Sequence, residues 1–134
     1  MKQGAGKRED RRTEARRRGD AAEDAALALL CAHGLRLLAR NLRFKVGELD
    51  LVMLDGEVLV FVEVRQRGRA DFGDALDSVD LRKARKLALA AQLYLQRHPH
   101  HGARACRFDV LGFNADAAPR WLRHAFRLDD LGLA

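Results

Sequence analysis

The sequence lacks several features that would assign it to common classes of protein. No apolar run approaches the roughly 18 residues that a membrane-spanning helix needs. The N-terminus is basic and has no hydrophobic segment, so we do not expect a secretory signal. There is no glycine-rich loop of the kind that binds phosphates, and no Ser/His/Asp grouping that would suggest nucleophilic catalysis. We therefore expect a cytoplasmic protein that does not bind membranes.

Cysteine is scarce and does not suggest a metal site. The two cysteines, Cys31 and Cys106, lack the spacing of metal ligands, and both fall within predicted apolar elements. Proteins of a reducing cytoplasm rarely keep disulfides. We therefore expect two buried free thiols rather than a disulfide.

Positive charge is concentrated at the start of the chain. The formal net charge is +6; residues 1–18 carry eight Lys and Arg against three acids, and the rest carries seventeen against sixteen. We expect residues 1–18 to be a flexible basic tail and residues 19–134 to fold as one domain. Such a tail would strengthen non-specific binding to nucleic acid.

A β-hairpin predicted within residues 46–67 carries the most informative side chains. Alternating hydrophobic residues flank Asp55-Gly56, and this dipeptide in that context is a strong hairpin signal. A two-residue loop at the dipeptide would set Glu48 opposite Glu63, and opposed residues point to the same side of a sheet. One face of the hairpin would then carry Glu48, Asp50, Glu63 and Arg65.

The three carboxylates on this face predict a site for a divalent metal ion. At cross-strand spacing they would repel one another and raise one another's pKa unless a cation lay between them. Glu63 carries the most weight, because it interrupts an otherwise apolar run, residues 58–65, where a buried carboxylate needs a partner or a metal.

Two alternatives are compatible with the same residues. A three-residue loop would shift the register by one position and turn Glu63 to the other face. Alternatively, Glu48 and Glu63 would be edge charges paired with Arg43, Lys45 or Arg65.

Helical periodicity and turn residues divide the rest of the chain. A first helix is predicted over residues 20–33, with Asp20 as N-cap and Gly34 as its C-terminal glycine. Glu23 in this helix either points toward the sheet or forms a capping box with Asp20. The other predicted elements are an exposed loop over residues 68–77, a long helix over 79–97 capped by Ser78 or Asp77, a strand over 103–113, and a strand or short helix over 121–128. This order predicts an α/β domain with a mixed sheet whose central hairpin carries the acids.

Short motifs also follow one another in a specific order from Gly19 to Phe126. They are Gly19-x-x-Ala22-Glu23-Asp24-x-Ala26, Asn41-Leu42-Arg43, Gly47-Glu48-Leu49-Asp50-Leu51-Val52, Phe61-Val62-Glu63-Val64-Arg65-x-Arg67, Phe72-Gly73, Val79 with Lys83, Arg107-Phe108-Asp109-Val110 and His124-Ala125-Phe126. In order and spacing they resemble the YraN family of small bacterial proteins. That pattern is in turn similar to the restriction-endonuclease-like nucleases, the PD-(D/E)xK superfamily, which includes archaeal Holliday-junction resolvases.

The resemblance implies a restriction-endonuclease-like α/β domain, with a central mixed sheet flanked by helices, that uses Mg²⁺ or Mn²⁺ to cleave DNA. It implies that Glu23 is the helix Glu, that Asp50 is the metal-bridging Asp, and that Glu63 is the second ligand. The hairpin face adds Glu48 as a further metal ligand. The nucleic-acid backbone would be held by Arg43, Arg67, Lys83 and Lys86.

One position departs from the family pattern. Where the related nucleases have a lysine two residues after the second acid, this chain has Arg65. A lysine can lose its proton and act on the attacking water, whereas an arginine stays charged. Arg65 could therefore stabilise charge on the scissile phosphate without acting as a base. Lys45, on the neighbouring strand, is expected to face away from Glu48 and so not to substitute.

Three hypotheses about function follow from these residues. The first is a nuclease acting on branched or single-stranded DNA. The second is a nucleic-acid-binding module that lacks hydrolysis because of Arg65, and the third is a protein-interaction scaffold whose acids form only ion pairs. We expect the partner to be a nucleic acid, with DNA favoured over RNA. The sequence is also compatible with a homodimer.

Overall fold

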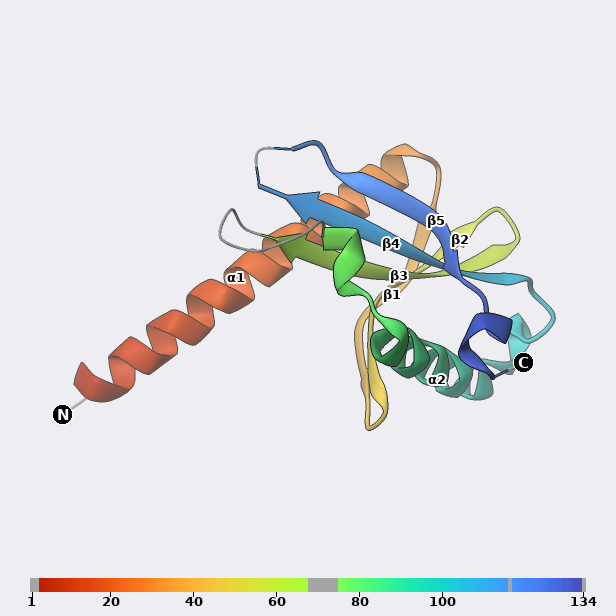
Figure 1. The fold of residues 1–134 in the computed structure, drawn as a ribbon, viewed down its shortest axis with the longest axis horizontal. Helices are drawn as coiled ribbons and strands as arrows, with labels where there is room; N and C mark the ends of the chain where they lie inside the picture. Colours follow the sequence, from red (N-terminus) through yellow and green to blue (C-terminus); the bar gives the residue numbers. More distant parts are fainter. Residues whose placement is uncertain (1–2, 68–74, 116, 134) are drawn as a thin grey trace.

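A five-stranded sheet forms the centre of the molecule (Figure 1). The computed structural model of the chain describes residues 3–67, 75–115 and 117–133, and of residues 3–15 and Asp77 it describes the backbone alone. The strands are β1 (Arg36–Phe44), β2 (Gly47–Asp55), β3 (Val58–Arg67), β4 (Cys106–Asn114) and β5 (Arg120–Phe126). The helices are α1 (Gln3–Ala32) and α2 (Leu81–Arg97), with 3₁₀ turns η1 (Ala75–Ser78), η2 (Pro99–His101) and η3 (Asp129–Leu131).

The sheet is mixed, as predicted. Its strands lie in chain order, β1-β2-β3-β4-β5, and every neighbouring pair is antiparallel except β3 and β4, which are parallel. Parallel neighbours need a crossover connection, and α2 lies within this one. The chain is therefore an α/β protein, and the predicted final strand or short helix is the strand β5.

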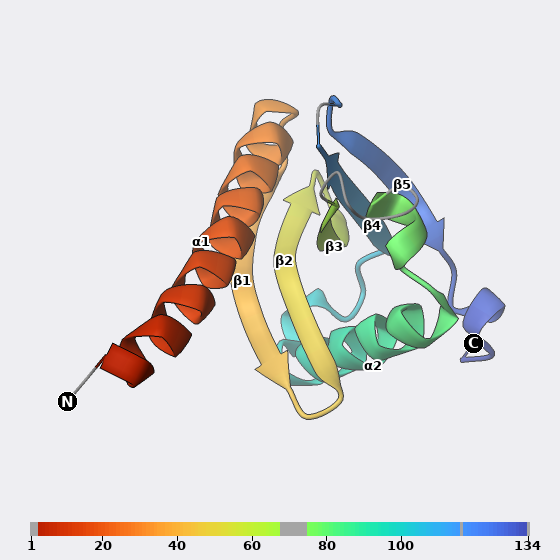
Figure 2. The ribbon, with the colours of Figure 1, turned by 60° about the vertical axis from the view of Figure 1, so that its left-hand side comes forward.

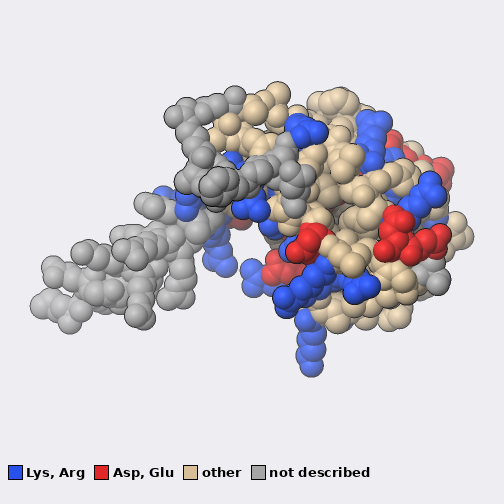
Figure 3. All heavy atoms as spheres, in the orientation of Figure 1, with Lys and Arg blue, Asp and Glu red and all other residues tan. Residues whose placement is uncertain are grey.

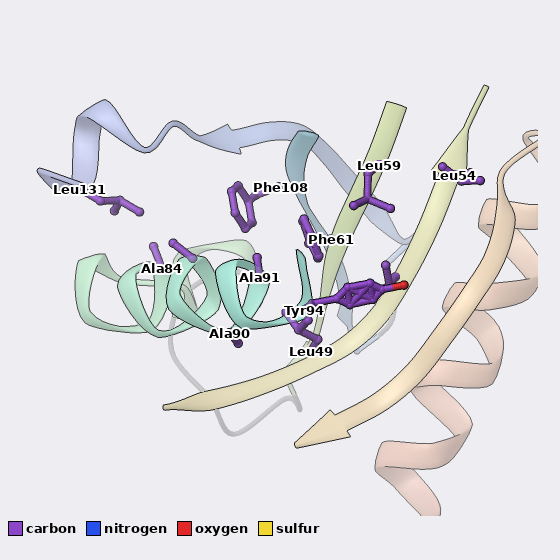
Figure 4. Packing of buried hydrophobic residues seen from close by; sticks show 12 residues of the cluster. Leu49, Leu54, Leu59, Phe61, Ala84, Ala90, Ala91, Tyr94, Phe108 and Leu131 are labelled. Carbon is purple, nitrogen blue, oxygen red and sulfur yellow. The ribbon is translucent and has the colours of Figure 1, made fainter. Parts of the chain in front are cut away.

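The two helices cover opposite faces of the sheet (Figure 2). Successive residues of β3 point to opposite sides, so Leu59 and Phe61 pack in the cluster that includes α2 (Figure 4), while Val60 and Val62 pack in the cluster that includes α1. A strand buried on both faces reads as a continuous apolar run, which explains the sequence of β3. None of the described helices is long and apolar enough to cross a membrane.

Helix α1 is longer than predicted. It begins at Gln3, so Asp20 lies inside the helix and the prediction that Asp20 is the N-cap was wrong. The predicted end is confirmed, because the helix stops at Ala32 and Gly34 adopts a left-handed φ of 90°. That conformation lets the Leu35 N–H donate to the Leu30 carbonyl at 3.1 Å. The flexibility of residues 1–18 and the domain boundary after them stay predictions.

The central hairpin is present, but its turn lies one residue later than predicted. Asp55 pairs with Val58 as the last residue of β2, so the turn is Gly56-Glu57. The Asp55 carboxylate is held in the strand by Arg107 of β4 at 2.8 Å. Gly56 takes the positive φ, 59°, at the first turn position, where glycine has no steric penalty. The register therefore moves by two positions relative to the prediction.

Helix α2 also begins later than predicted. Its N-cap is Asp80, whose side-chain Oδ1 accepts a hydrogen bond from the Lys83 N–H at 2.9 Å, so the assignment of the cap to Ser78 or Asp77 was wrong. Ser78 instead closes η1, where its hydroxyl donates to the Ala75 carbonyl at 2.6 Å. Of the predicted loop over residues 68–77, residues 68–74, including Phe72-Gly73, lie outside the described residues.

We expect Asp80→Ala to lower the free energy of unfolding by about 1 kcal/mol, because the Lys83 N–H loses its acceptor. Urea denaturation would measure the loss as a lower midpoint at unchanged slope. Asp80→Asn keeps a side-chain acceptor and should lose much less. An equal loss in both variants would show that the cap hydrogen bond is not what Asp80 contributes.

Both cysteines are free, as predicted, but the expectation that they are buried was wrong. Cys31 lies on the outer side of α1, one position after Leu30, which is fully buried against the sheet. Cys106 is the first residue of β4, at the margin of the sheet. Apolar neighbours in sequence therefore did not imply burial at either position.

Candidate active site

The site forms where β2 separates from β3. β2 pairs with β3 over Leu51–Asp55, whereas β3 continues beside β4 as far as Arg67. The side chains of β2 also lose their regular alternation here. Leu49 packs in the α2 cluster and Leu51 in the α1 cluster, although simple alternation would place both on one side of the sheet. Across from this point on β1, Asn41 has a left-handed φ of 55°, a conformation that asparagine tolerates. Asp50 is the residue at the change.

Asp50 and Glu63 are in direct contact at this point. Extending the register by one position beyond Leu51 and Val62 sets the two acids level with each other, and their carboxyl groups lie close enough for each to shift the pKa of the other. The Val64 N–H also donates to Asp50 Oδ2 at 2.9 Å. Glu63 is buried, with 4% of its surface exposed. The predicted placement of these two acids on one side of the hairpin is thus observed, although the partner predicted for Glu63 was Glu48.

The pKa values of the two carboxyl groups are raised. Burial, and then the negative charge of Asp50, raises the pKa of Glu63 to about 8. Burial also raises the pKa of Asp50, against the effect of the hydrogen bond from Val64. The two acids therefore hold a proton between them near neutral pH when no metal ion is bound, and they titrate as a pair.

Two cations reach the buried acid from different elements. Lys83 Nζ, in the first turn of α2, lies 3.5 Å from Glu63 Oε1, and Arg65 Nη1 lies 3.6 Å from the same oxygen. The Arg65 guanidinium is fixed on its other side, because Nε donates to Ser78 Oγ at 2.7 Å. The alternative in which Glu63 pairs with Arg65 is therefore also observed.

The sequence predicted that Lys83 contacts the nucleic-acid backbone, and it did not predict the contact with Glu63. A usable signal existed, because a crossover helix begins near the carboxyl end of the strand that precedes it. In this chain that rule brings the first turn of α2 back toward the end of β3, where Glu63 and Arg65 lie.

Glu23 approaches the same place from α1. Its Oε1 is buried, lies 3.5 Å from Arg40 Nη2 and accepts no hydrogen bond from the described residues. Burial, and then the charge of Asp50, raises the pKa of Glu23. Of the two accounts of Glu23, the inward orientation is observed, and the capping box is excluded because Asp20 lies inside the helix.

Glu48 is not part of the buried pair, although, in addition to burial, its negative charge contributes to the raised pKa of Asp50. Its side chain is 59% exposed and pairs with Arg43 at 3.5 Å, which is the edge pairing that the sequence left as an alternative. Within the described parts of the chain, no group of three or more His, Cys, Asp or Glu side chains is arranged to hold a metal ion. The predicted set of three carboxylates is thus reduced to the pair Asp50 and Glu63.

Basic side chains are also present on the β1–β2 hairpin and on the part of α2 beside it. A Cβ added to Gly47 would lie 3.1 Å from the Lys86 carbonyl, so the β1–β2 hairpin presses against α2 there. Figure 3 shows Lys and Arg side chains gathered over this hairpin and the start of α2. Arg67 is half-buried at the end of β3, and its carbonyl accepts from the Ala115 N–H at 3.0 Å. The exposed basic residues here include Arg43 and Lys45 of the hairpin, Arg82 and Lys86 of α2, and Arg97, whose guanidinium lies 4.9 Å from the centre of the Phe44 ring.

Comparison with known proteins agrees with the motifs. The model of "Uncharacterised protein family UPF0102" matches residues 22–113. A UPF0102 protein of Pseudomonas putida strain GB-1 is 55% identical over 114 residues, which cover 82% of this chain and 93% of that protein. A UPF0102 protein of Xanthomonas campestris pv. campestris strain B100 is 57% identical over 116 residues, which cover 84% and 93%. The chain therefore belongs to the uncharacterised protein family UPF0102, which is the YraN family that its motifs resemble.

Proposed function

We propose that this protein is a divalent-metal-dependent nuclease with a restriction-endonuclease-like fold that hydrolyses phosphodiester bonds in branched or single-stranded DNA. The observation that carries the proposal is the pair of contacting carboxylates, Asp50 and Glu63, at the point where the central strands separate. A pair of like charges with raised pKa values, flanked by cations, is typical of functional sites rather than of a stable core.

The donor set fits Mg²⁺ or Mn²⁺. Proteins commonly bind Mg²⁺ through one or two carboxylates, because this ion keeps several water ligands and completes its coordination shell with substrate phosphates. A divalent ion between Asp50 and Glu63 would also remove the repulsion that now holds a proton between them. Such an ion supplies Lewis acidity and lowers the pKa of the water that attacks the phosphorus.

The other residues of the site have complementary roles in this proposal. Asp50 and Glu63 would hold the ion, and Glu23 would support it from α1, where its buried oxygen has no hydrogen-bond donor among the described residues. Arg65 would contact the scissile phosphate, since its planar guanidinium binds phosphate well. The backbone on either side would be held by Arg43, Arg67, Lys83 and Lys86.

A second candidate is a nucleic-acid-binding module without hydrolysis, and Arg65 favours it. The guanidinium stays protonated and is fixed by Ser78, so it cannot take a proton from water. In that case binding would depend strongly on salt, and no cleavage would accompany it.

Cleavage of labelled branched, single-stranded and duplex DNA with Mn²⁺ tests the proposal, and Arg65→Lys is the most informative variant. We expect wild type to cleave slowly and the lysine variant to cleave about 10-fold faster. A positioned general base is often worth 10²–10⁴-fold, and the smaller figure reflects the lost contact with Ser78. Chelation of the metal should stop both reactions.

The same experiment separates the two candidates. DNA binding by both proteins without any cleavage would refute the nuclease and support the binding module. Cleavage by wild type that falls in Arg65→Lys would show that Arg65 is an adapted catalytic group rather than a handicap.

A further inference from the structure

Glu63 presents one carboxylate oxygen to two positive charges. Lys83 Nζ and Arg65 Nη1 lie 3.5 and 3.6 Å from the same atom, Oε1. A divalent cation bound to this carboxylate would come within a few ångströms of both groups, where like charges repel strongly in a partly buried site. A divalent cation bound at the acids would therefore weaken the attraction between Glu63 and these two groups, and the more mobile of the two would be displaced first.

The two cations differ in their freedom to move. Arg65 is anchored by its hydrogen bond to Ser78, and Ser78 in turn donates to the Ala75 carbonyl. Among the described residues, the Lys83 ammonium forms one ion pair, the contact with Glu63, and its side chain is 37% exposed. Its four-carbon stem is flexible, while its backbone is fixed by the Asp80 cap. Lys83 is the group that can leave without disturbing the fold.

A new partner for the ammonium would lie close by. Exposed basic residues lie on the same parts of the fold as Lys83. Arg82 precedes it, and Lys86 lies one turn further along α2, against the β1–β2 hairpin that carries Arg43 and Lys45 (Figure 3). Their charge would draw a phosphate backbone toward this side of the acids. An ammonium that leaves Glu63 can therefore pair with a phosphate of the bound strand and stay neutralised.

We propose that Lys83 is an exchangeable counter-ion of Glu63, paired with the carboxylate in the metal-free protein and with a nucleic-acid phosphate once a divalent cation binds. The proposal rests on the proposed function, because it assumes a metal at Asp50 and Glu63. Its consequence is that metal and nucleic acid bind cooperatively, each raising the affinity of the other by the same factor. The acids would then hold the metal ion firmly when a substrate is present.

The test measures Mn²⁺ binding by calorimetry, with and without a short single-stranded DNA, in wild type, Lys83→Gln and the matched control Lys86→Gln. Without DNA, Lys83→Gln should bind Mn²⁺ at least about 5-fold more tightly than wild type, and DNA should then tighten Mn²⁺ binding less than it does in wild type. Lys86→Gln removes the same charge one turn further along α2, without the contact to Glu63. It should weaken DNA binding and leave DNA-free Mn²⁺ affinity within about 2-fold of wild type at physiological salt.

Three results would overturn the exchange. They are an unchanged or weaker Mn²⁺ affinity in Lys83→Gln, an equal gain in Lys86→Gln, and Mn²⁺ binding to wild type that is indifferent to DNA. Circular dichroism of each variant checks the fold, and loss of Mn²⁺ binding in Asp50→Asn locates the ion at the paired acids. Failure of the nuclease proposal gives a different result: Mn²⁺ and DNA would bind cooperatively through Lys83, and gels of the same samples would show uncut DNA.

Discussion

Asp50→Asn should lower the rate of DNA cleavage about 10³-fold while leaving DNA binding intact or slightly tighter. The loss follows because the amide cannot replace the charged oxygen that would hold the metal ion, and metal stabilisation of a phosphoryl transition state is worth several kcal/mol. Binding survives because the substitution removes a negative charge from a surface that meets phosphates. Gel-based cleavage rates and fluorescence anisotropy on the same oligonucleotides would measure the two effects separately.

Glu48→Gln is the matched control for this variant. It removes the same charge two residues earlier on β2, but from an exposed side chain that pairs with Arg43 rather than with the buried acids. Its cleavage rate should stay within about 2-fold of wild type, since exposed ion pairs contribute little. Equal losses in the two variants would place the metal ion near the turn between β1 and β2, where Glu48 lies, and would contradict a site formed by Asp50 and Glu63.

Local sequence signals were sufficient to predict the parts of the site that lie on one hairpin. The period of two along β2 and β3 put Asp50 and Glu63 on one side, and the structure brings them into contact. The register was wrong by two positions, because Asp55 is held in the strand by Arg107, which is distant in sequence. An even shift preserves the face of every residue, so the error changed the partner of Glu63 but not its side of the sheet.

The parts of the site that depend on packing between distant elements could not be predicted in this way. The contact of Lys83 with Glu63 requires the position of α2 relative to β3, which the crossover determines. The change of face at Asp50 depends on the separation of β2 from β3, and nothing in the alternation of the sequence indicates it. The extent of α1 also escaped prediction, since a good capping residue at Asp20 lies inside a helix that simply continues.

The pair of acids also predicts how the stability of the metal-free protein depends on pH. An ordinary glutamate has a pKa of 4.5, whereas that of Glu63 is raised to about 8 in the folded protein. Between these values the folded protein binds more protons than the unfolded chain, so the free energy of unfolding falls as pH rises. The shift corresponds to a loss of roughly 4 kcal/mol between pH 4.5 and 8, with little further change from this group above that range.

Glu63→Gln should abolish most of this loss. The neutral amide resembles the protonated acid, so we expect the variant to match wild type near pH 4.5 and to exceed it by up to roughly 4 kcal/mol at pH 8. Urea unfolding in the presence of a chelator would give both profiles. Subtracting one profile from the other also removes the contribution of His101, which is the same in both proteins. Burial lowers the pKa of His101, so this residue contributes to stability above about pH 6.5 and loses that contribution as pH falls.

Added Mg²⁺ provides the decisive comparison for the same pair. It should restore the stability of wild type at pH 8, because a ligand that binds only the folded state stabilises it in proportion to the logarithm of ligand concentration. Glu63→Gln has lost one of the two proposed ligands and should gain much less. Parallel profiles for the two proteins, with or without Mg²⁺, would mean that Glu63 is fully neutralised by Lys83 and Arg65, and that the acids are a structural ion-pair network rather than a metal site.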